Sequence, residues 1–149
     1  MSDLHIDAAR PLDAGAVGDI LSEFIDTTPW MPRVHTRAED LAHASRMIDL
    51  GWVQIARSGE AVLGFLALEG EQLNALYVAK SVRSRGIGMR LLEAAKSGLS
   101  RMTLWTFQKN EAAQRFYLRH GFGEVARTQG EGNDEGLPDI RFEWLRGTV

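Results

Sequence analysis

The segment covering residues 72–121 constrains the fold most, because it alternates twice between a strand pattern and a helix pattern. QLNALYV (72–78) and RMTLWTF (101–107) are short runs rich in β-branched and aromatic residues, which is typical of strands. Each run is followed by helical periodicity, over residues 87–98 and 110–121. The middle of the chain is therefore predicted to form a strand, turn, helix, strand, helix unit within an otherwise antiparallel sheet.

The flanking sequence supplies the other elements. Thr36 and Glu39 match a capping box at the start of a helix that should end near Gly51. We also expect a helix over 13–26, strands over 4–10, 52–57 and 61–68, and closing strands over 123–129 and 139–145. The sequence thus predicts a mixed α/β (α+β) fold, in which about seven mostly antiparallel strands form a central sheet flanked by about four helices.

Composition narrows the class of protein. With 149 residues, 44% hydrophobic and 25% charged, the chain is expected to form a single domain over residues 1–149. Its formal charge of −3 gives no global reason to bind nucleic acid or an anionic membrane. The absence of cysteine excludes a disulfide framework, a thiolate nucleophile and a cysteine-ligated zinc site. No apolar run is long enough to span a bilayer and the N-terminus lacks the order of a secretion signal, so we expect a cytoplasmic protein.

The turn VRSRGIGMRLL (82–92) has the features of an anion site. Backbone N–H groups at a helix start lack partners, and the helix dipole adds partial positive charge there. Gly86 and Gly88 lack the Cβ atoms that would keep a phosphate from the backbone, and three arginines add cationic donors: Arg83, Arg85 and Arg90. The turn favours a phosphate or pyrophosphate ligand, with plain helix capping as the alternative. It matches neither a P-loop, which needs GK[ST], nor a Rossmann fingerprint, which needs a third glycine.

Two segments together resemble the GNAT superfamily of N-acetyltransferases. LYVAKSVRSRGIGMRLLEAA is similar to the family's acetyl-CoA-binding segment, whose signature of Arg or Gln, two residues, Gly, one residue, then Gly or Ala matches Arg83 through Gly88. NEAAQRFYLRHGF is similar to the Asn, helix, Phe-Tyr, Gly-Phe segment that follows the next strand in the family. With their strands the two segments cover residues 73–126.

The resemblance implies a binding mode for acetyl-CoA, which would be a cosubstrate without a metal. Two strands would splay apart, and pantetheine would pair with the backbone in the gap. The N–H groups from Ser84 to Met89 would hold the CoA pyrophosphate, and Asn110 would contact the pantetheine arm. The predicted cofactor-binding residues are Leu76, Tyr77, Val78, Arg83, Ser84, Arg85, Gly86, Ile87, Gly88, Met89 and Asn110.

Tyr117 is the predicted catalytic residue, since the resemblance places it near the thioester sulfur. Asn110 and Tyr117 are seven residues apart, which is two helical turns and about 10.5 Å of rise, so both project from nearly the same face. The ordinary pKa of a tyrosine, near 10, is close to that of the leaving thiol, and the Val78 N–H is expected to stabilise the oxyanion. The alternative roles are a core aromatic for Tyr117 and a helix N-cap for Asn110.

The general base is left open. Many family members carry a glutamate about where this chain has Asn74, which cannot accept a proton at neutral pH. Glu69 and Glu71, acting directly or through water, are candidates, although solvated turn carboxylates are the simpler reading. His35 and His120 are further candidates, and His120 is also suited to complement a helix C-terminus.

The acceptor is constrained only by the resemblance. It implies a pocket shaped by the first two helices, their connection and the loop between the last strands. Trp30 and Met31 offer an apolar wall, and three acids near the hairpin tip are suited to attract a cationic amine: Glu131, Asp134 and Glu135.

The function expected from the resemblance is acetyl transfer from acetyl-CoA to a primary amine of a small molecule or peptide. The alternatives are a protein N-terminal or lysine acyltransferase, and a CoA-binding regulatory module without turnover. The expected partners are acetyl-CoA and the amine acceptor, without nucleic acid or membrane, and a homodimer is left open.

Overall fold

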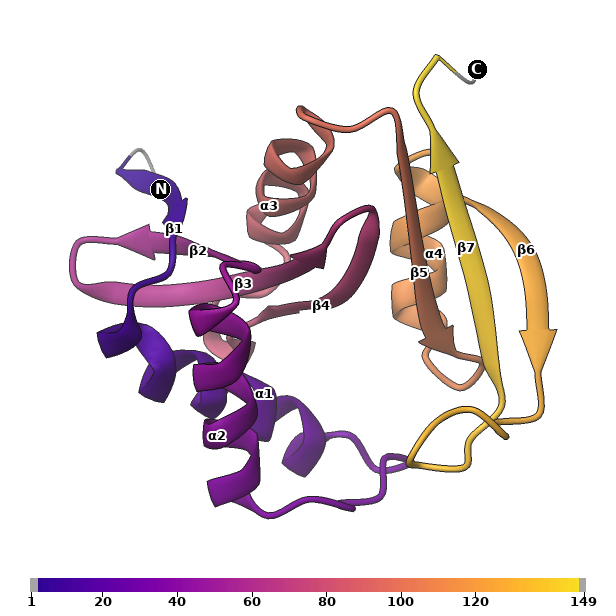
Figure 1. Ribbon diagram of the computed structural model, residues 1–149, viewed down its shortest axis with the longest axis horizontal. Coiled ribbons are helices and arrows are strands. Elements are labelled where there is room, and N and C mark those ends of the chain that lie inside the picture. The colour runs from indigo at the N-terminus through magenta and orange to yellow at the C-terminus, as the bar shows by residue number, and fades with distance from the viewer. Residues whose placement is uncertain (1–2, 148–149) are drawn as a thin grey trace.

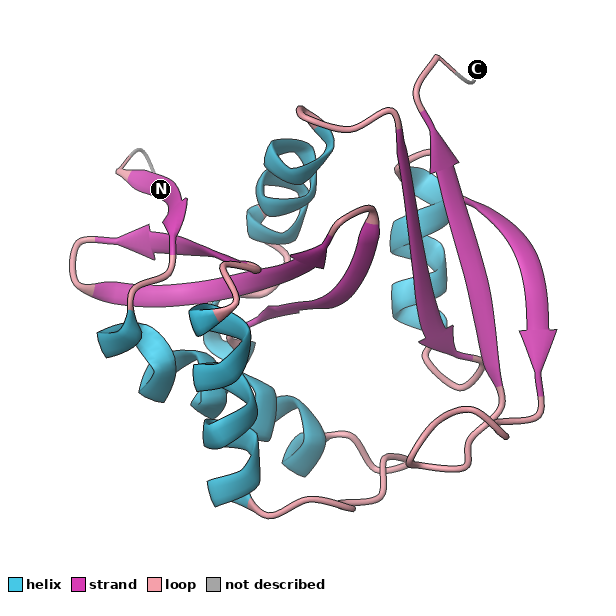
Figure 2. Ribbon diagram, in the orientation of Figure 1, coloured by secondary structure: helices cyan, strands magenta, loops and turns pink. Residues whose placement is uncertain are grey.

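The computed structural model describes residues 3–147 as one seven-stranded sheet with helices on both faces (Figures 1 and 2). The strands are β1 (Leu4–Ala8), β2 (Val53–Ser58), β3 (Ala61–Glu69), β4 (Gln72–Val78), β5 (Arg101–Phe107), β6 (Gly123–Thr128) and β7 (Asp139–Leu145). The helices are α1 (Ala14–Thr27), α2 (Arg37–Asp49), α3 (Ile87–Lys96) and α4 (Glu111–Arg119), with short 3₁₀ turns at Pro11–Asp13 and Lys80–Val82. Strand and helix order agree with the sequence prediction, and the predicted fold class is confirmed.

The strand order is β1-β2-β3-β4-β5-β7-β6, and every neighbouring pair is antiparallel except β4 with β5. A parallel pair needs a crossover, which α3 supplies between β4 and β5. This arrangement explains why the central segment alternates between strand and helix patterns.

Strands β4 and β5 separate soon after they meet. Their pairing is confined to Gln72 with Thr103 and Leu73 with Leu104, and beyond these pairs the two strands diverge in Figure 1. On the other side of β4 the register with β3 shifts between Ala67 and Leu68, which leaves Asn74 as the extra residue of a bulge. The remainder of β4, up to Val78, therefore has no partner strand on its β5 side.

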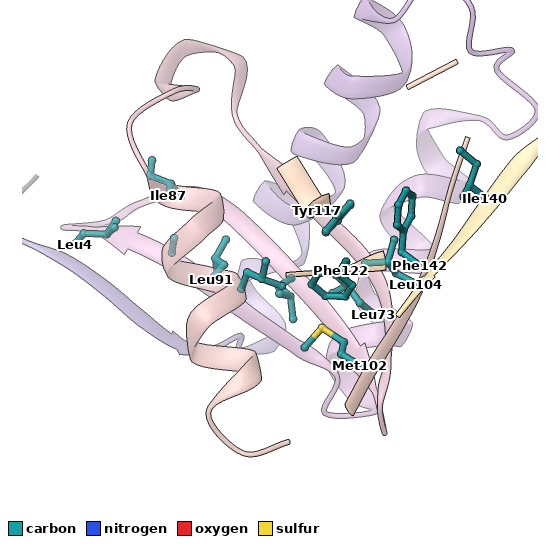
Figure 3. Close-up of a cluster of buried hydrophobic side chains, with 13 residues drawn as sticks. Leu4, Leu73, Ile87, Leu91, Met102, Leu104, Tyr117, Phe122, Ile140 and Phe142 are labelled. Carbon is teal, nitrogen blue, oxygen red and sulfur yellow. The ribbon is translucent and has the colours of Figure 1, made fainter. Parts of the chain in front are cut away.

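Two buried clusters cover the two faces of the sheet. One cluster packs α3 and α4 against β4, β5 and β7, and Figure 3 shows Leu91, Met102, Tyr117 and Phe142 within it. The other packs α1 and α2 against β2 and β3, through residues such as Val17, Met47 and Phe65. Alternate residues of β4 join opposite clusters, since Leu76 and Val78 pack with the first and Tyr77 with the second.

The predicted helix boundaries are correct to within two or three residues. Thr36 accepts the Glu39 N–H at 3.1 Å and Glu39 accepts the Thr36 N–H at 2.9 Å, so the capping box forms as expected. Among residues 3–147 no helix combines the length and apolarity needed to cross a bilayer.

Candidate active site

A cavity of about 730 Å³ opens where β4 and β5 separate. It is lined by Phe24, Leu76, Tyr77, Val78, Arg83, Ser84, Gly86, Ile87, Gly88, Met89, Asn110, Ala112, Ala113, Arg115, Phe116, Tyr117, Arg119 and His120. Phe24 belongs to α1 on one face of the sheet, whereas half of the lining residues belong to α3 and α4 on the other. The cavity therefore reaches through the gap in the sheet.

The start of α3 forms one end of the cavity. Gly86 precedes the helix with φ of +81°, a left-handed conformation that favours glycine, and Ser84 also has a positive φ of +66°. No side chain caps the helix, and the Arg90 N–H donates to the Gly86 carbonyl at 3.1 Å. The preceding N–H groups, at Ile87, Gly88 and Met89, belong to the first turn and are available to an anion.

Gly88 lies at the contact between α3, α4 and the end of β4. A Cβ atom at Gly88 would lie 3.6 Å from Phe116 and 3.8 Å from Val78, which is ordinary contact. The space around Gly88 therefore admits a Cβ atom but little more, whereas the left-handed conformation at Gly86 favours glycine.

Three arginines line the cavity, and two of them were missed by sequence reasoning. Arg83 lines it as predicted, with its Nε donating to the Val78 carbonyl at 3.2 Å. Arg115 and Arg119 line it from α4 and lie one helical turn apart. Their i, i+4 spacing, on the same helix as Tyr117, is the sequence pattern that could have predicted them. Arg85, a predicted site residue, is not among the lining residues.

Arg90 also departs from the expected arrangement. Its guanidinium donates to the Leu4 carbonyl at 3.4 Å and so points toward β1 rather than into the cavity. No carboxylate is among the lining residues, so the wall of the cavity carries only positive side-chain charge. Such a wall suits an anionic ligand.

The free edge of β4 forms a second wall. The Ala79 N–H donates to the Leu63 carbonyl at 2.8 Å, so the backbone groups of Ala79 face β3. Because these directions alternate along a strand, the N–H groups of Val78 and Leu76 face the gap where β5 is missing. An extended ligand with amide groups would pair with this edge as a strand does.

Asn110 and Tyr117 lie on α4, as the helical spacing predicted. Asn110 is the N-cap of α4 and accepts the Ala113 N–H at 3.1 Å, and it lines the cavity as well. Tyr117 is buried, with 8% of its surface exposed, and packs against Phe122 and Phe142 (Figure 3). Tyr117 therefore packs in the core and also lines the cavity.

The hydroxyl of Tyr117 is accessible from the cavity. It makes no hydrogen bond within residues 3–147. Since every fully buried side-chain oxygen or nitrogen in that range has a hydrogen-bond partner, the Tyr117 oxygen is not fully buried. Burial, together with the neighbouring Tyr77, raises the pKa of Tyr117 well above its ordinary value. The expectation of a pKa near 10 was wrong, because it neglected the low polarity of the core.

The candidate bases predicted on the β3–β4 hairpin lie outside the cavity. Glu69 accepts a hydrogen bond from the Asn74 side chain at 3.0 Å, and Glu71 lies 3.4 Å from Arg101. His120 lines the cavity, where burial, with a smaller contribution from Lys96, lowers its pKa. Lys96, rather than His120, complements the end of α4 by donating to the His120 carbonyl at 2.6 Å.

The connection between α1 and α2 meets the end of β5 and the β6–β7 loop. Trp30 packs edge-on against Phe107 at the end of β5, with ring centroids 5.8 Å apart. His35 Nε2 lies 3.3 Å from Asp134 Oδ2, which joins this connection to the β6–β7 loop, as Figure 1 shows. The two segments expected to shape the acceptor pocket therefore touch. Within residues 3–147, no group of three or more histidine, aspartate or glutamate side chains is arranged for a metal ion.

Comparisons with known proteins agree with this geometry. Residues 49–124 match the model of the acetyltransferase (GNAT) domain family. The chain is 36% identical over 87 residues to the peptidyl-lysine N-acetyltransferase YjaB of Salmonella typhimurium, a match covering 58% of each protein. It is 33% identical over 103 residues to YjaB of Escherichia coli, covering 69% of this chain and 68% of that protein. The aligned part thus spans between half and about two thirds of these relatives.

Solved structures extend the similarity to the whole fold. The solution structure of apo YjaB from E. coli has a TM-score of 0.78 at 23% identity, covering 95% of this chain and 97% of that one. The structure of yncA from S. typhimurium with its cofactor acetyl-CoA has a TM-score of 0.71 at 21% identity, covering 99% of this chain and 96% of that one. The splayed strands, the glycine turn opening a helix and the matching family model lead to one conclusion: this chain belongs to the GNAT acetyltransferase family.

Proposed function

We propose that this protein transfers an acetyl group from acetyl-CoA to the side-chain amine of a lysine in a peptide or protein. One observation carries the proposal: a single cavity joins the open start of α3, the unpaired edge of β4 and the accessible hydroxyl of Tyr117. The lysine acceptor is supported by the names of the relatives, which are peptidyl-lysine N-acetyltransferases. A cytoplasmic location and a homodimer remain predictions.

The charge of the cavity wall and the backbone groups that it offers are suited to acetyl-CoA. The first-turn N–H groups of α3 and Arg83 are suited to the pyrophosphate, and Arg115 and Arg119 add positive charge along α4. On this edge the N–H and C=O groups of Leu76 are suited to the pantetheine amides, whereas the Val78 carbonyl already accepts from Arg83. Asn110, as an N-cap, uses its side-chain oxygen on Ala113, which leaves its NH₂ group as a donor toward the ligand.

Transfer then proceeds by direct attack. The neutral amine nitrogen bonds to the acetyl carbonyl carbon, and the Val78 N–H stabilises the oxyanion that develops. The carbon–sulfur bond breaks and its electron pair stays on sulfur, where the Tyr117 hydroxyl donates a hydrogen bond. Beginning with an ammonium acceptor, the products are an amide, the CoA thiol and one proton released to solvent.

The proposal is tested with a panel of acceptors and acetyl-CoA. Blocked peptides with one lysine, peptides with a free N-terminus and small primary amines are compared by thiol release and by mass spectrometry of the product. We expect acetylation of the lysine peptide. Thiol release without an acetylated product would indicate hydrolysis and would contradict the proposal.

A CoA-binding module without turnover is the second candidate, and the absence of an acid in the cavity favours it. Asn74 stands where many family members have a glutamate, and its side chain bonds Gln72 at 2.8 Å and Glu69 at 3.0 Å. Tight CoA binding with no acetylated product from any amine would establish this alternative.

A further inference from the structure

Two arginines on α4 line the cavity with their charged groups unpaired. Arg115 and Arg119 are both exposed and lie one helical turn apart. Neither guanidinium makes a hydrogen bond or an ion pair within residues 3–147, although Glu111 precedes Arg115 by four residues, a spacing that suits an ion pair. Arg33, by contrast, contacts two carboxylates. The donors of both arginines on α4 are therefore free for a ligand.

The pair is unfavourable for the helix by itself. Like charges four residues apart on a helix repel each other. Arg119 lies in the last turn, where the helix dipole offsets part of this cost, but Arg115 lies in the middle of α4 and gains no such compensation. No carboxylate is among the lining residues of the cavity that could neutralise the pair. An anion bound in the cavity would relieve the repulsion.

The helical positions place the pair at the exposed end of the cavity wall and Tyr117 at its buried end. Phe116 faces α3, since a Cβ atom at Gly88 would lie 3.6 Å from its ring. Successive helix residues are about 100° apart, so Tyr117 lies to one side of Phe116, in the core (Figure 3). The arginines lie to the other side, at about 60° for Arg119 and about 100° for Arg115. The wall on α4 therefore runs from a core tyrosine past the contact with α3 to two surface arginines.

The groups of acetyl-CoA follow one another in a matching order. In the proposed binding mode the thioester lies at Tyr117 and the pyrophosphate at the first turn of α3. The far end of the molecule is a ribose with a 3′-phosphate, a monoester whose charge is roughly −1.5 to −2 at pH 7. This end follows the pyrophosphate on the way out of the cavity, where the wall is exposed. Arg83 and the first-turn N–H groups are suited to the pyrophosphate, so the pair on α4 is available for the second phosphate.

We propose that Arg115 and Arg119 bind the 3′-phosphate of CoA and thereby select acetyl-CoA over thioesters whose carrier lacks this group. This inference rests on the proposed acetyl transfer. Two neighbouring guanidiniums offer several N–H donors to the phosphate oxygens, and the phosphate neutralises the like-charge pair. The substrate class is an acyl thioester of a 3′-phosphorylated nucleotide carrier. Thioesters of pantetheine without the nucleotide lack the group that the pair recognises.

The test compares two ligands that differ only in this phosphate. Calorimetry measures the Kd of acetyl-CoA and of acetyl-dephospho-CoA, which lacks the 3′-phosphate. Wild type should bind the dephospho form about tenfold more weakly, because charge-assisted contacts are lost. In the variant Arg115→Gln/Arg119→Gln the two ligands should bind about equally, and each single substitution should give an intermediate ratio. The wild-type difference should shrink at high salt, since both guanidiniums are exposed.

Two further variants serve as matched controls. Arg83→Gln removes a charge from the proposed pyrophosphate contact, so it should weaken both ligands by the same factor and keep the wild-type ratio. Arg46→Gln removes an exposed arginine of α2, outside the cavity lining, and should bind both ligands as wild type does. It controls for the change in net charge.

The outcomes separate this inference from the proposed function. Equal affinity of wild type for the two ligands, together with acetylation of a lysine peptide, would overturn the phosphate assignment while acetyl transfer stands. Equal weakening of both ligands by the double substitution would overturn it too, since the arginines would then serve the pyrophosphate. A changed KM for the lysine peptide with both Kd values unchanged would reassign the pair to the acceptor. Wild-type protein that binds neither ligand would reject both proposals.

Discussion

Tyr117 acquires its chemistry from its surroundings as much as from its residue type. A tyrosine in the core, with a raised pKa, is a weaker acid than the thiol of CoA. Its hydroxyl is accessible, however, and a protonated donor facing a departing thiolate stabilises the charge on sulfur without giving up the proton completely. In the proposed transfer, Tyr117 is therefore better described as a hydrogen-bond donor to sulfur than as a group that gives up its proton.

We expect Tyr117→Phe to lower kcat by about 10²-fold and to leave acetyl-CoA affinity unchanged. The ring and its packing on Phe122 and Phe142 remain, and only the donor is removed. Steady-state kinetics and calorimetry measure the two quantities. An acyl thioester with a more acidic leaving thiol should reduce the defect, because its thiolate needs less stabilisation. Full turnover in the variant would exclude this role.

The arginines of the turn should differ in their effect on cofactor binding. Replacing Arg83, which lines the cavity, with glutamine should weaken acetyl-CoA binding about tenfold, because a charge-assisted contact to phosphate is lost. Arg85→Gln is the matched control, since Arg85 does not line the cavity and should bind normally. Titration calorimetry at two salt concentrations decides this. Equal losses in both variants would indicate a general effect of charge.

At the scale of elements, the start of α3 combines a strained turn with an open helix end. The positive φ values at Ser84 and Gly86 turn the chain so that the first N–H groups of α3 face the cavity. The space in front of them depends on Gly88, which lies between Val78 and the Phe116 ring of α4. The distance between α3 and α4 therefore sets the room available for the pyrophosphate in the proposed binding mode.

This arrangement predicts opposite results for two substitutions of Gly88. Alanine should be tolerated, because its Cβ atom would lie 3.6 Å from Phe116. Valine adds methyl groups where there is already contact, so Gly88→Val should weaken acetyl-CoA binding by about tenfold or more. Calorimetry on both folded variants measures the difference. Normal affinity in Gly88→Val would remove this turn from the binding site.

At the scale of the whole molecule, Asp13 connects the start of α1 to the sheet. Its carboxylate is buried, accepts the Arg10 N–H at 2.8 Å and lies 3.3 Å from Arg57 of β2. Burial by itself would raise the pKa of Asp13, but the hydrogen bonds from Arg10 and the charge of Arg57 outweigh it and lower the pKa. The contribution to stability is thus present above the unfolded pKa, near 4, and is lost as pH falls through the lower folded value.

We therefore expect Asp13→Asn to lower the free energy of unfolding by about 2 kcal/mol at pH 7. The difference from wild type should shrink as the pH falls below about 4, because the wild-type carboxylate becomes protonated. Denaturant unfolding at pH 7 and pH 3 measures both values. Asp19→Asn, at an exposed position of the same helix, should match wild type at each pH. A difference for Asp13→Asn that does not depend on pH would contradict the linkage.

The sequence by itself determined the elements, their order and one half of the site. Hydrophobic period and capping residues are local signals, so Thr36, Gly86 and the central alternation of strand and helix could be interpreted without coordinates. The helix spacing of Asn110 and Tyr117 is also local, and both residues line the cavity. The glycine turn is also a local signal, and it predicted the anion-binding end of the proposed site.

Only the tertiary structure decided what lies across the gap. The separation of β4 from β5 depends on long-range pairing, which ends at Leu73 and Leu104, 31 residues apart in the chain. The contact of His35 with Asp134 joins residues 99 positions apart, and only the folded chain brings Tyr77 and Tyr117 into the wall of one cavity. The high pKa of Tyr117 likewise comes from burial by distant residues. Burial, strand pairing and the direction of a side chain are properties of contacts between elements, and local sequence patterns do not contain them.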